Sequence, residues 1–285
     1  MNTIRALMLV LAAAMLILPG AARGEVYVEA YLGGLQGANS ALNPTTAHQG
    51  GNGPIWDFTE SHNIPGRLDP AVIGGLKVGT WFVKEGFLGF NYPDWMKYFG
   101  FYLDFSFHRL NFRNQTGNTV ARDNVAAIIG LPGSSANTTN TFMSEGTAAT
   151  LAFMFGGRFG FLPDSEIPFG RLQPYVAVGP ALFFASQQPR LSSAAFNAFT
   201  GGFYPYTIKA PSNSCVTIAL AVDAGVRWMC LKNVSLDVSF KYRFAEPSFQ
   251  NAFADPLEMT PGLRSFSLNP AFHLFSGQVG VAYHF

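Results

Sequence analysis

Three residues in the stretch LDFSFH have the side-chain types of a nucleophilic triad. Asp104, Ser106 and His108 stand at alternate positions. In an extended strand, neighbours on one face are ~6.5–7 Å apart, whereas a catalytic Ser–His pair needs a contact of ~2.6–3.2 Å. We therefore expect these three side chains to fill a polar interior, and we predict that the protein is not an enzyme.

A second set of residues has the types that bind metal ions, in a segment rich in Gly, Asn and Pro. The set consists of His48, Asp57, Glu60 and His62. Its spacing fits no familiar ligand pattern, and residues of this kind in a loop are usually solvated. The chain also contains no phosphate loop, dinucleotide fingerprint or zinc pattern. We expect neither a metal nor a cofactor.

Charged residues recur at every second position, opposite apolar ones. In VSLDVSFKYRF, residues 234–244, a period of two separates the charged and apolar side chains completely, as in a strand with two unlike faces. The charged face of the predicted strands contains Glu29, Lys77, Asp104, Arg158, Asp223, Arg227, Asp237, Lys241 and Arg243. Four acids and five bases are nearly balanced, so an interlocking ionic interior is expected, since an isolated buried charge is costly. A charge-lined conduit remains the alternative.

The composition indicates a protein that exposes its apolar face to lipid. Only 12% of the residues are charged and 15% are aromatic, whereas soluble domains have about a quarter charged. After residue 24 there is no apolar run of the ~18 residues that a membrane helix needs. A closed β-barrel is the other architecture that hides its backbone polar groups in lipid.

The first 24 residues have the pattern of a secretory signal peptide. Met1–Arg5 carry one positive charge, Ala6–Leu18 are apolar, and Ala22-Arg23-Gly24 is a small-x-small ending. Removing Arg5 and Arg23 leaves a formal charge of 18 − 2 − 17 = −1. Because there is no basic surplus, nucleic-acid binding is not expected. The predicted domains are the leader, 1–24, and a barrel, 25–285.

Eight alternating segments could cross a membrane as tilted strands. They are Val26–Gln36, Ala71–Phe82, Tyr98–Arg113, Thr147–Phe159, Arg171–Ser186, Ser214–Met229, Val234–Glu246 and His273–Phe285. The connectors are alternately long and short, the rhythm of a membrane barrel with short periplasmic turns and long extracellular loops. We predict an all-β, antiparallel, up-and-down membrane barrel of eight strands. The connector Val83–Lys97 leaves ten strands as an alternative.

Aromatic residues and the two cysteines stand at the ends of these segments. The predicted periplasmic rim contains Phe82, Phe99, Phe159, Trp228 and Phe285, because aromatic rings favour the headgroup level. Cys215 and Cys230 would lie ~50 Å apart on one strand, too far for a disulfide between them.

Several stretches resemble the small eight-stranded OmpA-like and opacity-like outer-membrane barrels of Gram-negative bacteria. They are the leader, LQPYVAVGPALFF, GVRWMCLKNVSLDVSFKYRF and the closing VGVAYHF. The resemblance implies a monomer in the outer membrane, in contact with its lipid and lipopolysaccharide. It also implies a signal read by the barrel-assembly machinery. That signal would consist of Val279, Val281, Tyr283 and Phe285.

Proteins with this kind of fold have different functions, so the fold does not identify the function. The roles expected are envelope integrity or surface interaction, through the long loops, with a host, a neighbouring cell or a ligand. A small porin-like channel is an alternative, and a lipid-modifying enzyme is a less favoured one.

Overall fold

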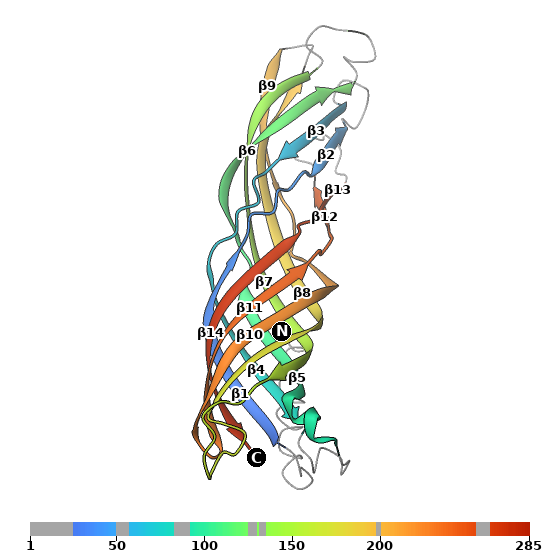
Figure 1. Ribbon diagram of the computed structural model, residues 1–285. Helices are drawn as coiled ribbons and strands as arrows, with labels where there is room; N and C mark the ends of the chain where they lie inside the picture. The colour runs from blue at the N-terminus through green and yellow to red at the C-terminus, as the bar shows by residue number, and fades with distance from the viewer. Residues whose placement is uncertain are drawn as a thin grey trace.

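The protein is an elongated all-β molecule, and the strands of its lower part are tilted with respect to the long axis (Figure 1). The computed structural model describes residues 25–49, 57–82, 92–124, 130, 135–197, 201–254 and 263–285. The predicted leader, 1–24, lies outside these residues. Within the described ranges, no helix is both long enough and apolar enough to span a membrane.

Eight antiparallel strands close into a barrel. They are β1 (Glu25–Gly37), β4 (Ala71–Trp81), β5 (Phe99–Arg109), β7 (Ser135–Arg158), β8 (Leu172–Asn197), β10 (Asn213–Leu231), β11 (Val234–Ala245) and β14 (Phe272–His284). Each strand pairs with the next barrel strand along the chain, and β1 pairs with β14 to complete the ring. The predicted eight-stranded up-and-down barrel is confirmed, and each predicted segment overlaps one of these strands.

The connector Val83–Lys97, which allowed a ten-stranded alternative, contributes no barrel strand in its described residues. Its residues 83–91 lie outside the described ranges. Asp94–Tyr98 form a short 3-10 helix, η4, directly before β5. The ring of paired strands therefore has eight members.

The barrel wall alternates as its sequence does. On β11 the apolar side chains point outward, with Val238 60% and Phe240 54% exposed, while Asp237 and Lys241 are buried inside. A strand turns successive side chains to opposite faces, so the separation of residue types along the sequence becomes a separation of lipid-facing wall from interior.

The barrel strands β7 and β8 continue far beyond the membrane-spanning part of the wall. They have 24 and 26 residues, whereas a spanning strand needs about 9–11. At the outer end they carry the other strands of the molecule. These are β2 (Thr45–Gln49), β3 (Asp57–Asn63), β6 (Phe112–Asp123), β9 (Gly202–Lys209) and the hairpin β12 (Phe249–Ala254) with β13 (Leu263–Leu268).

The outer strands form an ordered extension, where the sequence suggested only long exposed loops. The sheet runs β2-β3-β6-β7 on one side and β8-β9 on the other. The β12–β13 hairpin packs between them, with β13 against β2 and β12 against β9 and β10. Above the ends of β5 and β10, the backbone N–H and C=O groups on the outer edges of β7 and β8 need new partners. Strand β6 pairs with β7 there, and β9 pairs with β8.

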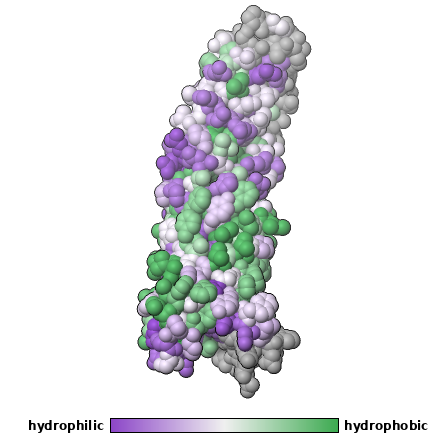
Figure 2. Space-filling view, in the orientation of Figure 1, coloured by the Kyte–Doolittle hydropathy of each residue, from purple (hydrophilic) through white to green (hydrophobic). Residues whose placement is uncertain are grey.

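The outward side chains divide the molecule into an apolar belt and a polar extension. Along β7, Phe153 and Phe155 are exposed at 38% and 52% in the belt, whereas the exposed residues higher up are polar, among them Thr139 and Thr141. Figure 2 shows the green hydrophobic surface concentrated in the lower half and purple hydrophilic surface above it. The belt is the part of the wall suited to hydrocarbon, and the extension is suited to water.

Candidate functional site

The barrel interior is the main concentration of charged side chains. All nine residues predicted for the charged face lie inside the barrel, and none is more than 4% exposed. Some face each other in the register of neighbouring strands, as Glu29 with Lys77 and Asp223 with Lys241. The β10–β11 hairpin also pairs Arg227 with Asp237.

Lys77 is the centre of this network. Its Nζ lies 3.0 Å from Glu29 Oε1, 3.2 Å from Asp223 Oδ2 and 3.7 Å from Asp237 Oδ1. It also donates a hydrogen bond of 3.2 Å to the hydroxyl of Tyr175. Lys77 is on β4 and Asp223 is on β10, four places away in the ring of eight, so their contact joins opposite walls.

A second contact crosses the interior higher in the barrel. Lys241 Nζ on β11 lies 2.6 Å from Asp104 Oδ2 on β5, again four strands away. The Arg243 guanidinium reaches across to donate to Ser106 Oγ at 3.2 Å. Because opposite walls touch at two levels, side chains occupy the full width of the interior, as expected for a barrel of eight strands.

At the lower end a fifth acid completes the charge balance. Arg158 forms two hydrogen bonds with the carboxylate of Glu25, the one from its Nη1 to Oε1 being 2.7 Å. The Arg158 guanidinium also lies between the rings of Trp81 and Phe169, 4.4 and 4.3 Å from their centroids. Sequence reasoning missed Glu25, whose alternation with Tyr27 and Glu29 could have shown it. With Glu25 the interior holds five acids and five bases.

Inward-facing tyrosines, also missed, connect the charges. Tyr31 donates to Asp104 at 2.6 Å, Tyr102 to Asp223 at 2.9 Å and Tyr175 to Asp237 at 2.8 Å. The Lys77 ammonium lies 5.5–5.7 Å from the centroids of these three rings. A tyrosine supplies both a donor for a carboxylate and an aromatic face for a cation. The sequence could have indicated these tyrosines, because they alternate in phase with the charged residues of their strands.

An apolar layer closes the barrel above the ions. Phe112 packs against Phe142 and Phe272, with ring centroids 5.8 and 5.9 Å apart, and Phe183 lies 6.2 Å from Phe272. All four side chains are at most 3% exposed. They come from β6, β7, β14 and β8, so the layer forms only where the extension meets the barrel.

A buried polar cluster lies inside the extension. His62 is hydrogen-bonded to Thr46 at 2.9 Å and to Thr119 at 2.8 Å. Tyr206 donates to Glu60, and burial together with the Glu60 carboxylate raises the pKa of Tyr206. Of the four residues weighed as metal ligands, Glu60 and His62 are thus in this cluster, with Nε2 of His62 3.8 Å from Glu60 Oε2.

The other two residues considered as metal ligands are His48 and Asp57. The side chains of His48 and Asp57 lie outside the described part of the chain. Within the described residues, no group of three or more His, Cys, Asp or Glu side chains is placed to hold a metal ion.

The residues that resembled a triad are separated by their partners. Asp104 binds Lys241 and Tyr31, and Ser106 accepts from Arg243. His108 Nδ1 donates instead to the backbone carbonyl of Arg109 at 2.8 Å. All three side chains are buried in the wall interior. Asp104 and Ser106 therefore belong to the ionic network, whereas Ser106 and His108 form no hydrogen bond with each other.

The C-terminal residues and the aromatic rim occupy the outer face of the lower barrel. Val279, Val281, Tyr283 and Phe285 are each 50–59% exposed. Of the predicted rim, Phe159, Trp228 and Phe285 are exposed at 42–56%, and Phe82 and Phe99 are half-buried. Phe159 stacks on Tyr98, with centroids 5.7 Å apart.

Both cysteines are free thiols. Cys215 and Cys230 are half-buried near opposite ends of β10. Their separation along a single strand rules out a bond between them.

A closed ring of eight strands, a charged interior and an outward apolar belt define a transmembrane β-barrel of the small outer-membrane type. No protein-family model matches the chain, and no curated protein matches it in sequence. The class rests on the strand pairing and on the placement of the side chains.

Solved outer-membrane proteins are similar to the chain along most of their length. OprG from Pseudomonas aeruginosa is 11% identical, covering 93% of this chain and 99% of its own, with a TM-score of 0.42. A major outer membrane protein from Thermus thermophilus is 11% identical, with 92% and 100% covered and a TM-score of 0.40. Neisserial surface protein A is 13% identical, with 91% and 97% covered and a TM-score of 0.30.

Proposed function

We propose that the protein is a monomeric, non-enzymatic barrel of the outer membrane whose closed wall holds an ordered β-extension at the cell surface for interaction with other molecules. The observation that carries the proposal is the extension itself. Strands β7 and β8, at ~3.3 Å per residue, are about 80 Å long, whereas the apolar band of such barrels is about 25 Å tall.

The chemistry of the extension supports a surface role. Four of its exposed residues on β7 are Ser135, Asn137, Thr139 and Thr141, which are compatible with water and offer donors and acceptors. Its inside is packed with apolar and hydrogen-bonded side chains, so the surface is held rigid. A rigid surface loses little conformational entropy on binding, which favours recognition.

The hairpin β12–β13 offers a test because it forms a separate two-stranded sheet. Residues 249–268 would be replaced by a short Gly-Ser linker, and cells displaying either form would be compared for binding to host cells, other bacteria and matrix proteins. We expect binding to fall while the barrel remains inserted and protected from protease. Equal binding by both forms to every surface would count against surface interaction and favour envelope integrity.

The filled interior supports a barrel that does not conduct. Ion pairs that cross the interior lie below the aromatic layer. A solute passing through the barrel would have to displace the aromatic layer and these ion pairs. In planar bilayers the purified protein is expected to show no stepwise ion conductance. Conductance that disappears on Lys241→Ala or Asp237→Ala substitution would establish the porin-like alternative.

The non-enzymatic proposal rests on the triad-like residues of β5, where Ser106 and His108 bond to other partners and not to each other. The purified protein would be incubated with lipopolysaccharide, and the lipid examined by mass spectrometry. An unchanged lipid is the expected result, and a deacylated or modified product would contradict it.

A further inference from the structure

We propose that the barrel interior binds a small inorganic anion of the chloride type at the Arg243 guanidinium. The site lies between the aromatic layer and the ion pair of Lys241 with Asp104. The proposal goes beyond surface interaction, because it concerns the enclosed side of the barrel wall. It rests on buried hydrogen-bond donors and a buried positive charge that the neighbouring side chains do not fully match.

Arg243 is a buried base with unused donors. The residue is 1% exposed, and within the described part of the chain its hydrogen bond runs from Nη2 to Ser106 Oγ at 3.2 Å. Its Nε and Nη1 atoms have no hydrogen-bond partner among the described residues. A guanidinium carries five N–H donors and no acceptor. Because leaving buried donors unmatched is costly, a ligand that accepts several hydrogen bonds would stabilise this position.

The charge of Arg243 is also incompletely compensated. Asp104 Oδ2 lies 4.0 Å from its Nη2, but the same oxygen is bound more closely by Lys241 Nζ, at 2.6 Å. Asp104 is thus shared by two bases, of which Arg243 is the more distant. Arg227, lower in the barrel, instead contacts two carboxylates at 2.5 and 3.4 Å. A negative ion beside Arg243 would supply the charge that its own level of the barrel lacks.

Two hydroxyl groups lie beside the guanidinium. Ser106 on β5 and Thr150 on β7 are register partners, and such partners have Cβ atoms about 4.5–5.5 Å apart. Both side chains are buried, and Thr150 Oγ1 has no hydrogen-bond partner among the described residues. Ser106 Oγ accepts a hydrogen bond from Arg243, and its own O–H is a further donor. Three residues from three strands can therefore donate to one ion.

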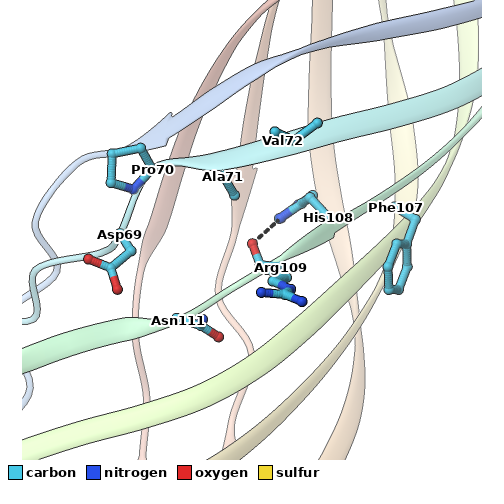
Figure 3. Close-up of a pocket in the computed structure, with 8 residues that line it drawn as sticks. All are labelled: Asp69, Pro70, Ala71, Val72, Phe107, His108, Arg109 and Asn111. Carbon is cyan, nitrogen blue, oxygen red and sulfur yellow. Dashed lines mark hydrogen bonds between the residues drawn. The ribbon is translucent and has the colours of Figure 1, made fainter.

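The unmatched acceptor in this region is His108, the next inward residue of β5. Figure 3 shows its hydrogen bond with the Arg109 carbonyl, to which Nδ1 donates. Nε2 therefore carries the lone pair, and it has no hydrogen-bond partner. One lone pair accepts one hydrogen bond, whereas Nε and Nη1 of Arg243 together carry several N–H groups. Donors are in excess, and an anion suits this excess better than water, which brings O–H donors of its own.

The surroundings keep such an ion away from bulk solvent. Thr150 is the register partner of Phe183, which belongs to the aromatic layer. On the other side, Lys241 is the next inward residue below Arg243 on β11 and carries the ion pair with Asp104. The attraction between an anion and a guanidinium is stronger in such a buried place than at a surface. The ion would therefore be a fixed component of the folded barrel.

Bromide offers a direct test, because it can replace chloride and can be located by its anomalous scattering. The protein would be unfolded in urea, refolded into detergent in sodium bromide and crystallised from the same salt. We expect an anomalous peak beside Nε or Nη1 of Arg243. A refined structure with water there, or with no anomalous peak at this place, would overturn the proposal.

A measurement in solution separates a specific site from an adventitious ion. The folding equilibrium in urea would be compared in sodium chloride and in sodium gluconate, whose anion is much larger. At about 100 mM salt, chloride should favour the folded state about tenfold, as a site with a Kd of about 10 mM would. A bromide peak in the crystal without any chloride effect in solution would identify an adventitious ion only and would also overturn the proposal.

Variants connect the chloride effect to this site. Arg243→Met should remove the effect, and Thr150→Val, which keeps the shape of the side chain but loses its hydroxyl, should reduce it. Arg109→Met is the matched control, because it removes an exposed arginine at the outer end of β5 and should keep the effect. An equal chloride effect in Arg243→Met and wild type would refute the site. If Arg243→Met does not fold, an equal effect in Thr150→Val and wild type would do so.

Discussion

Replacing Lys77 tests whether the interior network stabilises the fold as its geometry implies. In Lys77→Met the hydrocarbon stem is kept, while the ammonium that lies within 3.7 Å of three carboxylates is lost. Removing one partner of a buried ion pair destabilises a protein by about 3–5 kcal/mol. We expect about 3 kcal/mol, at the lower end, because each carboxylate keeps another partner.

Those remaining partners can be named. Arg227 still contacts Glu29 and Asp237, at 2.5 and 3.4 Å. Tyr102 still donates to Asp223. The loss should therefore be well below three times the value for one pair, although it leaves five buried acids facing four bases.

The assay is equilibrium urea unfolding of the protein in lipid vesicles, followed by tryptophan fluorescence. Asp223→Asn in the Lys77→Met background restores four acids to four bases, so the double variant should be more stable than the sum of the two single changes predicts. Lys97→Met, in the exposed helix η4, is the control and should change stability by only ~0.5 kcal/mol. A Lys77→Met protein within ~1 kcal/mol of wild type, below the range for a broken buried pair, would refute this account of the interior.

Two further predictions concern the ends of the molecule. Tyr206 has its pKa raised by burial and by Glu60, so the folded extension favours the neutral phenol; this stabilisation is complete below the ordinary tyrosine pKa of about 10 and is lost as pH rises above it. Near-ultraviolet circular dichroism should show an alkaline loosening of the extension that Tyr206→Phe shifts or removes, and an unchanged transition would contradict the assignment. Phe285, 56% exposed at the foot of β14, is predicted to be read during assembly. Phe285→Ser should slow insertion in cells, measured as folded protein in the outer-membrane fraction, while Val178→Ala on β8 should not; equal rates would remove Phe285 from the signal.

Periodicity was enough to predict the wall of the barrel. Each barrel strand turns one face to lipid and the other to the interior, so the separation of VSLDVSFKYRF into two faces is a local property of the chain. Even some ionic contacts could be read in this way, because the short turn between β10 and β11 places Asp223 beside Lys241.

The extension was not predictable by the same reasoning. The segment SANTTNTF at the top of β7 faces water on one side, so the apolar alternation that marks a lipid-facing strand is absent there. Its strand character depends on pairing with β6 and, at Thr141 and Phe142, with the far end of β8. Neither pairing can be read from the segment itself.

The sequence by itself determined which side chains face lipid, which face inward and how many strands cross the membrane, because each of these follows from the two-residue repeat of an extended chain. Only the tertiary structure decided which inward charges meet. The contacts of Lys77 with Asp223 and of Lys241 with Asp104 span opposite walls. These contacts and the aromatic layer exist because closing the ring brings strands together that no local pattern relates.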